Sequence, residues 1–214
     1  MAEAVLKIVH EGPVAWVTLN RPERLNALNR ELSQALLDCF TGLRHQLATR
    51  VVILQGAGRA FCAGLDLHER QAGAAATEAG NPFETQHRIR DIMIAMRRCP
   101  QPVIGICQGA ASGGGFTLAL ASDVRLVTPD ARMNAAFIKM GLTGCDMGSS
   151  YFLPRLVGSS VASESQTPSN CPPSTASVCP VIQRACGEAR NSATSAISSG
   201  VPIRPKGMLA SVRA

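Results

Sequence analysis

Apolar and polar positions follow two different rhythms along the first part of the chain. Residues 4–19 alternate at every second position on both sides of a turn at residues 10–13, which predicts a β-hairpin. From Leu32 to Leu47 the apolar residues recur at three- and four-residue steps. This second stretch is therefore expected to be a helix with one apolar face, and Asn29 is its predicted N-cap.

Short apolar runs without alternation predict buried strands between further helices. Three such runs lie at residues 51–55, 102–107 and 124–127, and they are separated by predicted helices at residues 83–98 and around 116–120. Strands and helices that follow one another in this order are typical of an α/β fold with parallel strand pairing.

Two glycine-rich turns follow two of these predicted strands. They are residues 58–67 and 109–116, and each leads into a predicted helix. Glycine lets the backbone turn sharply and lets a ligand approach the chain closely, and a helix N-terminus presents unpaired N–H groups to an anion. Two such turns, once brought together, would aim two backbone N–H groups at one oxygen, which is the construction of an oxyanion hole.

Length, composition and charge favour one domain with an appendage. The 214 residues are 46% hydrophobic, but no uninterrupted apolar run approaches the ~20 residues of a membrane span. The first residues lack the basic segment and apolar core of a signal peptide, so we expect a cytoplasmic protein without a membrane partner. The net charge of +6 is modest and the aromatic residues are few, which argues against nucleic-acid binding.

The cysteines are expected to be free thiols. In a chain without an export signal, apolar or glycine-rich surroundings favour burial over disulfide formation, and this describes Cys39, Cys62, Cys99, Cys107 and Cys145. No pair has the C-x-x-C spacing of a zinc site, so no bound metal is expected.

The pattern breaks abruptly after Gly158. Residues 159–214 carry 12 serines and 6 prolines without a sustained period, and such a stretch buries too little apolar surface to offset its ordering entropy. We therefore divide the chain into a core, residues 1–158, and a disordered or irregular tail, residues 159–214, in which a helix could still begin at Ser159. A native disordered tail and a shifted reading frame both explain this break.

Four parts of the core resemble signature segments of the crotonase superfamily, the enoyl-CoA hydratase/isomerase group. They are residues 18–28 (TLNRPERLNAL), residues 60–67 (AFCAGLDL), residues 109–123, and the closing pair 140–142 and 151–158. Each alone would be weak, but together they have the order and spacing of the family and span nearly the whole core. A break inside so well matched a chain favours the shifted reading frame.

The resemblance implies a fold of stacked ββα units, in which two roughly perpendicular sheets are wrapped by helices. The family continues with C-terminal helices that build trimers, often paired into hexamers, and this helical domain is expected to be lacking here. The implied ligand is a coenzyme A thioester, without any other cofactor. By position, the N–H groups of Leu65 and Gly114 would hold its carbonyl oxygen. The coenzyme path would be lined by Arg24, Ala27, Ala63, Asp66, Leu67 and Gly113.

The sequence departs from the family at its two catalytic glutamates. Thr117 and Phe137 stand at the positions where hydratases of the family carry these acids, so ordinary two-glutamate hydration is not expected. Asp146 stands where dienoyl-CoA isomerases and certain dehalogenases of the superfamily place a working aspartate. A carboxylate there could abstract a proton or attack as a nucleophile, or it could cap the helix that enters at Ser149.

Other polar residues near the motifs have structural explanations. Asp66 is interpreted as the cap of a short helix, and Asp123 as an acceptor for turn or backbone N–H groups. Ser112 lacks the Gly-x-Ser-x-Gly context of a hydrolase. The four histidines are expected at the surface, and His68 is the only one near the predicted site.

The sequence supports two alternative functions. The first is an acyl-CoA enzyme of the hydratase/isomerase type, a lyase or isomerase of fatty acid metabolism that works through Leu65, Gly114 and Asp146. The alternative is a non-catalytic or defective acyl-CoA-binding homologue without the hydratase glutamates. A peptidase on a related fold is disfavoured because no serine–histidine constellation is present.

Overall fold

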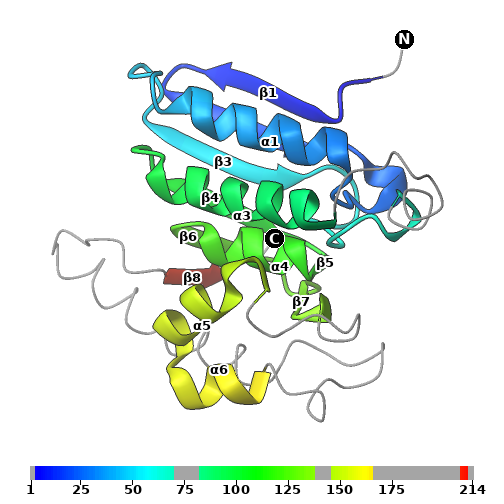
Figure 1. Cartoon of the computed structure of the whole chain (residues 1–214). Coiled ribbons are helices and arrows are strands. Elements are labelled where there is room, and N and C mark those ends of the chain that lie inside the picture. The colour runs from blue at the N-terminus through cyan, green and yellow to red at the C-terminus, as the bar shows by residue number, and fades with distance from the viewer. Residues whose placement is uncertain (1–2, 70–81, 138–145, 166–207, 212–214) are drawn as a thin grey trace, which may run out of the picture.

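The computed structural model describes residues 3–69, 82–137, 146–165 and 208–211, and its elements are labelled in Figure 1. A six-stranded sheet, whose strands follow one another from β1 at the top of this view to β8 lower down, forms the frame. Helices α1 and α3 pack side by side along it, and α5 and α6 lie at the far end, beyond β6 and β8.

The strand order of the large sheet is β1-β2-β3-β4-β6-β8. The first two strands form an antiparallel hairpin and β2, β3, β4 and β6 pair in parallel, as the sequence predicted. The sixth strand, β8, also pairs in parallel, with β6. The strands are β1 (Leu6–Glu11), β2 (Val14–Leu19), β3 (Val51–Gly56), β4 (Val103–Cys107), β6 (Val124–Val127) and β8 (Met208–Ser211). A second sheet pairs β5 (Ala110–Ser112) with β7 (Arg132–Asn134).

The helices agree with most of the sequence-based expectations. They are the 3-10 turn η1 (Pro22–Arg24), α1 (Arg30–Leu43), α3 (Pro82–Arg98), α4 (Gly114–Ala121), the 3-10 turn η3 (Asp146–Gly148), α5 (Ser149–Val157) and α6 (Ser159–Ser165). The predicted cap is confirmed, because the Asn29 side chain accepts a hydrogen bond from the Leu32 N–H at 2.9 Å. A helix begins at Ser159, a position at which the sequence allowed one.

The predicted end of the first helix at Leu47 is wrong. The helix stops at Leu43, and the Leu47 side chain is 84% exposed. The buried amide of Gln101 explains the stop, because its Nε2 donates to the carbonyls of Leu43 (2.9 Å) and Gln46 (3.1 Å). These bonds satisfy carbonyls that a helix end leaves without partners, so the chain turns back toward β3.

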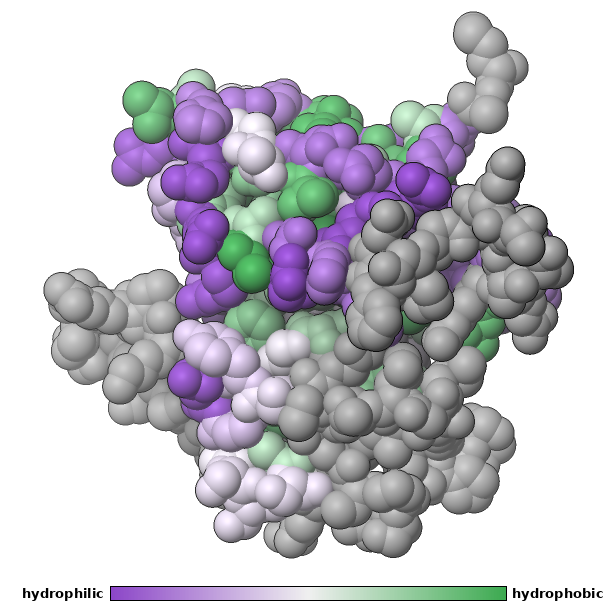
Figure 2. Space-filling view, in the orientation of Figure 1, coloured by the Kyte–Doolittle hydropathy of each residue, from purple (hydrophilic) through white to green (hydrophobic). Residues whose placement is uncertain are grey.

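The core lies between the sheet and its helices. In β2 the inward positions Ala15, Val17 and Leu19 are fully buried. The helices meet them with one apolar stripe each, as their period predicts: Leu32, Leu36 and Phe40 from α1, and Ile89, Ile92 and Met96 from α3. The outer faces of both helices are mainly hydrophilic, whereas the surface over α5 and α6 is mostly of intermediate hydropathy (Figure 2).

Helix α4 is the most deeply placed helix, since all eight of its residues are buried. Its C-terminal end is held by the buried Arg125, whose Nη1 donates to the carbonyls of Ala119 and Leu120 at 3.1 Å. A cation at this end also complements the helix dipole. Nearby, Asp123 accepts from the Val103 N–H at 2.9 Å, which confirms its predicted backbone role. These contacts tie the C-terminal end of α4 to β6, the strand that carries Arg125.

The tail adds one element that its pattern did not predict. Residues Met208–Ser211 form β8, which pairs in parallel with β6 at the edge of the large sheet. A four-residue strand is too short to show a period in sequence. The division of the chain at Gly158 stays a prediction.

Candidate active site

The two glycine-rich turns lie side by side. They are joined by a parallel bridge between Cys62 and Ala111, in which the Cys62 N–H donates to the Ala110 carbonyl (2.9 Å) and the Ser112 N–H donates to the Cys62 carbonyl (3.0 Å). The first turn therefore runs as a neighbour of β5, which leads directly into α4. This is the juxtaposition that an oxyanion hole built from both turns requires.

Glycine is needed where the turns touch. A Cβ on Gly64, whose φ is +97°, would lie 2.7 Å from the Ser112 carbonyl oxygen and 3.4 Å from the Gly114 nitrogen. A Cβ on Gly115 would lie only 2.1 Å from the Cys62 carbonyl oxygen. Any side chain at either position would push the turns apart, so the absence of a Cβ is what permits the contact.

The Leu65 N–H is directed away from its neighbouring segment. Leu28 donates its N–H to the Gly64 carbonyl (2.7 Å) and accepts from the Asp66 N–H (3.0 Å). In such a parallel bridge the residue between the two partners, here Leu65, directs its own N–H to the other side. Within the described part of the chain this N–H meets no acceptor.

The Gly114 N–H is the second donor at the same contact. Gly114 is the first residue of α4 after the N-cap Gly113, so its N–H has no partner inside the helix and lies at the positive end of the helix dipole. The side chains of Leu28 and Met147, both largely buried, pack beside it: a Cβ on Gly114 would lie 2.8 Å from Leu28 Cδ1 and 3.2 Å from Met147 Sδ. The surroundings of this donor are thus apolar.

Asn26, which was not among the site residues predicted from sequence, fixes the shape of the first turn. Its side chain is fully buried, and its Nδ2 donates to the carbonyls of Ala57 (2.9 Å) and Ala60 (2.8 Å). Its Oδ1 accepts from the Arg21 N–H at 2.9 Å. Asn26 has a φ of +56°, a left-handed conformation that asparagine tolerates better than most residues. An asparagine in a turn segment was the one available signal.

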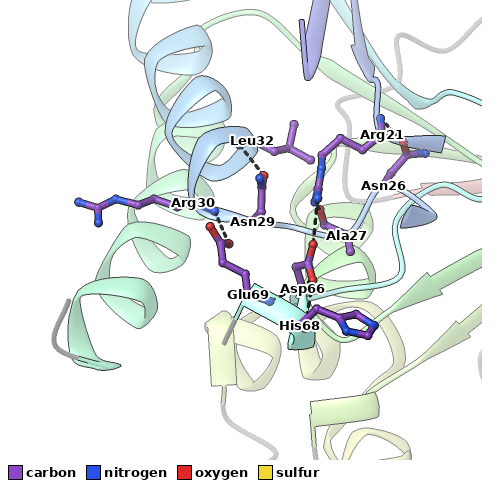
Figure 3. Close-up of polar contacts among 9 residues, drawn as sticks. All are labelled: Arg21, Asn26, Ala27, Asn29, Arg30, Leu32, Asp66, His68 and Glu69. Carbon is purple, nitrogen blue, oxygen red and sulfur yellow. Dashed lines mark hydrogen bonds and ion pairs between the residues drawn. The ribbon is translucent and has the colours of Figure 1, made fainter. Parts of the chain in front are cut away.

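Arg21, also absent from the residues predicted from sequence, forms an ion pair with Asp66 (Figure 3). The Arg21 Nη2 lies 2.9 Å from Asp66 Oδ2, and its Nη1 donates to the Ala27 carbonyl. The other Asp66 oxygen accepts from the N–H groups of His68 (3.2 Å) and Glu69 (3.4 Å), which confirms the predicted cap. The ion pair joins positions 45 residues apart, so no local pattern predicts it.

The ionisation of Asp66 follows from these contacts. Burial acts to raise the pKa of its carboxyl group, but the Arg21 guanidinium and the N–H groups of Glu69 and His68 outweigh burial and hold the pKa below its ordinary value. Asp66 is therefore an anion at neutral pH with both oxygens already bonded to protein groups.

The remaining predicted coenzyme-path residues border the same contact. The Ala63 N–H donates to the Leu25 carbonyl at 2.9 Å, and the Ala27 N–H donates to the Arg24 carbonyl at 3.0 Å, so the first turn and the segment after β2 lie together. Arg24 is exposed in η1, and Leu67 is 40% exposed. The buried Gly113 donates its N–H to the Asn134 carbonyl at 3.0 Å.

The two positions without the family's glutamates are both buried. Thr117 is fully buried in α4, and its hydroxyl donates to the Gly113 carbonyl at 3.3 Å. Phe137 packs beside Gly113, where a Cβ would lie 3.9 Å from the Phe137 nitrogen. Neither side chain exchanges a proton near neutral pH.

Asp146 opens η3, which packs against α3 and α4. The N-cap position of α5 is Gly148, and the capping role of the Asp146 side chain stays a prediction. Two left-handed residues, Met147 (φ +54°) and Gly148 (φ +83°), turn the chain into α5. The nearby motif at residues 140–142 lies outside the described residues.

The buried thiols among the described residues are unreactive at neutral pH. Cys62 and Cys107 are free and buried, and burial raises the pKa of each thiol to about 12. Cys39 and Cys99 are free but only half-buried, and Cys145 lies outside the described residues. The expected surface positions of the histidines are confirmed for His10, His45, His68 and His87.

Residues 3–69, 82–137, 146–165 and 208–211 contain neither a candidate metal site nor a candidate membrane span. Within those ranges, no three His, Cys, Asp or Glu side chains gather in a way that could hold a metal ion. The described helices also include none that combines the length and apolar character needed to cross a bilayer.

Comparisons with known proteins agree on one family. The family model described as "Enoyl-CoA hydratase/isomerase" matches residues 10–195. The chain is 37% identical over 167 residues to the "Probable enoyl-CoA hydratase echA12" of Mycobacterium bovis, covering 75% of this chain and 58% of that protein. It is 36% identical over 158 residues to the 1,2-epoxyphenylacetyl-CoA isomerase of Escherichia coli, covering 74% and 60%.

A solved structure gives the same result for the fold. The crystal structure of a monofunctional enoyl CoA isomerase from M. smegmatis matches with a TM-score of 0.61 and 38% sequence identity, over 77% of this chain and 68% of that one. The chain spans about three fifths of the length of the two curated relatives above.

Proposed function

Because the chain belongs to the enoyl-CoA hydratase/isomerase family of the crotonase superfamily, we propose that it is an enzyme that binds a coenzyme A thioester and stabilises an enolate of it. The donors would be the N–H groups of Leu65 and Gly114. One observation carries the proposal: both N–H groups stand at the contact of the two glycine turns, and neither has an acceptor among the described residues.

The two donors would act on the ligand through electrostatic attraction. When a proton leaves the carbon next to a thioester, negative charge develops on the carbonyl oxygen. Two fixed donors in apolar surroundings favour that charged state, and the loss of one such donor typically costs ~3 kcal/mol of transition-state stabilisation. Leu28 and Met147 supply apolar surroundings on one side of Gly114. The side chains at positions 65 and 114 need no chemistry of their own, because the backbone provides both donors.

We propose the same segments as the coenzyme path. The segment that holds Arg24 and Ala27 is hydrogen-bonded to the first turn, and Ala63, Asp66 and Leu67 belong to that turn. Arg24 is exposed and cationic, which suits an anionic phosphate group. Asp66 would contribute through its backbone, since both carboxylate oxygens are engaged. No cofactor besides the substrate's own coenzyme A is proposed, and the setting we infer is fatty acid metabolism in the cytoplasm.

The reaction we propose is proton transfer with Asp146 as the acid–base group. Thr117 and Phe137 cannot serve as carboxylates, which disfavours the addition of water by paired glutamates. An isomerisation needs only that one group take a proton from carbon and return it elsewhere on the enolate. The relative from Escherichia coli is named an isomerase and that from Mycobacterium bovis a probable hydratase, so the missing glutamates, and not these names, support this choice.

Binding of acetoacetyl-CoA tests the proposed site, because its enolate carries the charge that the two donors should hold. We expect the ligand to raise the melting temperature of the chain in a thermal unfolding scan, since a ligand that binds only the folded state stabilises it. Buffer alone serves as the baseline, and an equal concentration of ATP is the control for nonspecific anion binding. A cooperative melt that acetoacetyl-CoA leaves unchanged would contradict the proposed site.

The substitution Asp146→Asn tests the proposed acid–base group. On the best substrate of an acyl-CoA panel we expect turnover to fall by about 10²–10⁴-fold, while the affinity for acetoacetyl-CoA changes by less than about twofold. Asp38→Asn, on the exposed face of α1, is the matched control and should change neither quantity. Unchanged turnover in Asp146→Asn would remove this residue from the mechanism.

The second candidate function is a non-catalytic acyl-CoA binder. It is favoured by the two neutral residues, Thr117 and Phe137, at the family's acid positions. Binding of acetoacetyl-CoA without turnover of any acyl-CoA in the panel would select this candidate.

A further inference from the structure

We propose that the Arg21–Asp66 ion pair is a positioning device that aims the Leu65 N–H at the ligand oxygen. The inference rests on the proposed function, because it concerns the direction of one of its two donors. Neither residue would touch the thioester through its side chain. Arg21 and Asp66 would act through the backbone of the first turn, so they are positioning residues and not catalytic ones.

The first step concerns the peptide group between Gly64 and Leu65. Its carbonyl oxygen is held by the Leu28 N–H at 2.7 Å. The described chain has no cis peptide bond, and in a trans peptide the C=O and N–H point in opposite directions. Whatever holds the Gly64 carbonyl against Leu28 therefore also determines where the Leu65 N–H points.

The second step concerns the other side of Leu65. The Asp66 N–H donates to the Leu28 carbonyl at 3.0 Å. The Asp66 side chain accepts through Oδ1 from the N–H groups of His68 and Glu69, and through Oδ2 from Arg21 Nη2 at 2.9 Å. Arg21 in turn donates to the Ala27 carbonyl, the residue just before Leu28. The guanidinium therefore fastens the segment that carries Leu28 to the residue that follows Leu65.

The ion pair also restricts rotation of the peptide group that follows Gly64. Gly64 has a φ of +97°, and its lack of a Cβ gives this peptide a wide range of rotations. The ion pair limits that range. Its side chains are only 14% (Arg21) and 7% (Asp66) exposed, so the attraction between them is screened little by solvent and salt. A misplacement of about 1 Å in such a donor can cost about 10²-fold in rate.

Asp66→Asn separates this positioning role from the helix cap. Asparagine keeps an oxygen that can accept from His68 and Glu69, as N-caps commonly do, but it removes the charge that pairs with Arg21. We would measure the dissociation constants of acetoacetyl-CoA and of free CoA by calorimetry, because only the first ligand has an oxygen for the Leu65 N–H. We expect the affinity for acetoacetyl-CoA to fall by at least about tenfold and that for CoA by less than about twofold.

Arg97→Gln is the matched control. It breaks the Arg97–Asp123 ion pair (2.7 Å), which lies near the C-terminal end of α4, opposite Gly114. Neither affinity should change in this variant. Should Asp66→Asn fail to fold, Arg21→Lys offers the same comparison, since lysine keeps a cation beside Asp66 but cannot span Asp66 and Ala27 as a guanidinium does. Its ratio of the two affinities should shift in the same direction.

The outcomes separate the inference from the proposed function. Equal losses for both ligands, or no loss for either, would overturn the positioning role and leave the oxyanion site standing. If the unsubstituted chain binds CoA but gains nothing from the acetoacetyl group, the proposed site itself is overturned, and the positioning role with it.

Discussion

Replacing Gly114 with proline should abolish most of the affinity for acetoacetyl-CoA. Proline has no N–H, so the substitution removes one of the two proposed donors. Gly114 is the first residue of α4, which is the helical position where proline is tolerated best. By analogy with other oxyanion donors, we expect the affinity, and the turnover of any substrate, to fall by about 10²–10³-fold. Calorimetry with the folded variant measures the first quantity directly.

Gly114→Ala is the control that makes this prediction sharp. Alanine adds the same Cβ but keeps the N–H. That Cβ would meet Leu28 Cδ1 at 2.8 Å and Met147 Sδ at 3.2 Å, which are atoms near the ends of flexible side chains. We expect those side chains to shift, so that the alanine variant keeps most of its affinity. Equal losses in the proline and alanine variants would mean that the Cβ, and not the N–H, causes the effect.

Much of the frame could be predicted from sequence because its elements carry local signals. The hairpin has strict alternation around a turn, and α1 has both an apolar stripe and the cap residue Asn29. The end of α1 could not be predicted, because Gln101, whose amide caps its last carbonyls, lies 58 positions from Leu43. Strands β5 and β7 have three residues each, which is too short for a period to show.

In the candidate site, too, some features could be predicted from sequence and others could not. Leu65 and Gly114 could be chosen from the two glycine turns together with a family resemblance. The bridge between Cys62 and Ala111 that brings the turns together has no sequence signature. The same is true of the contacts of Arg21 and Asn26, whose partners are backbone carbonyls or an aspartate far along the chain. Local pattern and the family resemblance therefore suggested the two proposed donors, whereas the contacts that we propose to aim one of them appear only in the structure.

Gly115→Ala should destabilise the fold more than any other substitution considered for these turns. Alanine favours helix over glycine by ~0.5–1 kcal/mol, so propensity alone predicts that this change within α4 would be stabilising. The added Cβ, however, would lie 2.1 Å from the Cys62 carbonyl oxygen and 2.7 Å from Cys62 Cβ. The backbone must move to relieve this clash, and overpacking of this kind costs about 1–3 kcal/mol, occasionally more.

Gly42→Ala gives the opposite result from the same chemical change. Gly42 lies in the last turn of α1, and a Cβ there would meet nothing within 4 Å. With no clash to oppose it, the helix propensity of alanine should raise the free energy of unfolding by ~0.5–1 kcal/mol. Urea unfolding of the two variants and the unsubstituted chain measures both effects. Because Cys62 bridges to β5, the Gly115 variant should also separate the two turns and lose its affinity for acetoacetyl-CoA. A Gly115 variant as stable as the Gly42 variant would mean that the turns do not touch through Cys62.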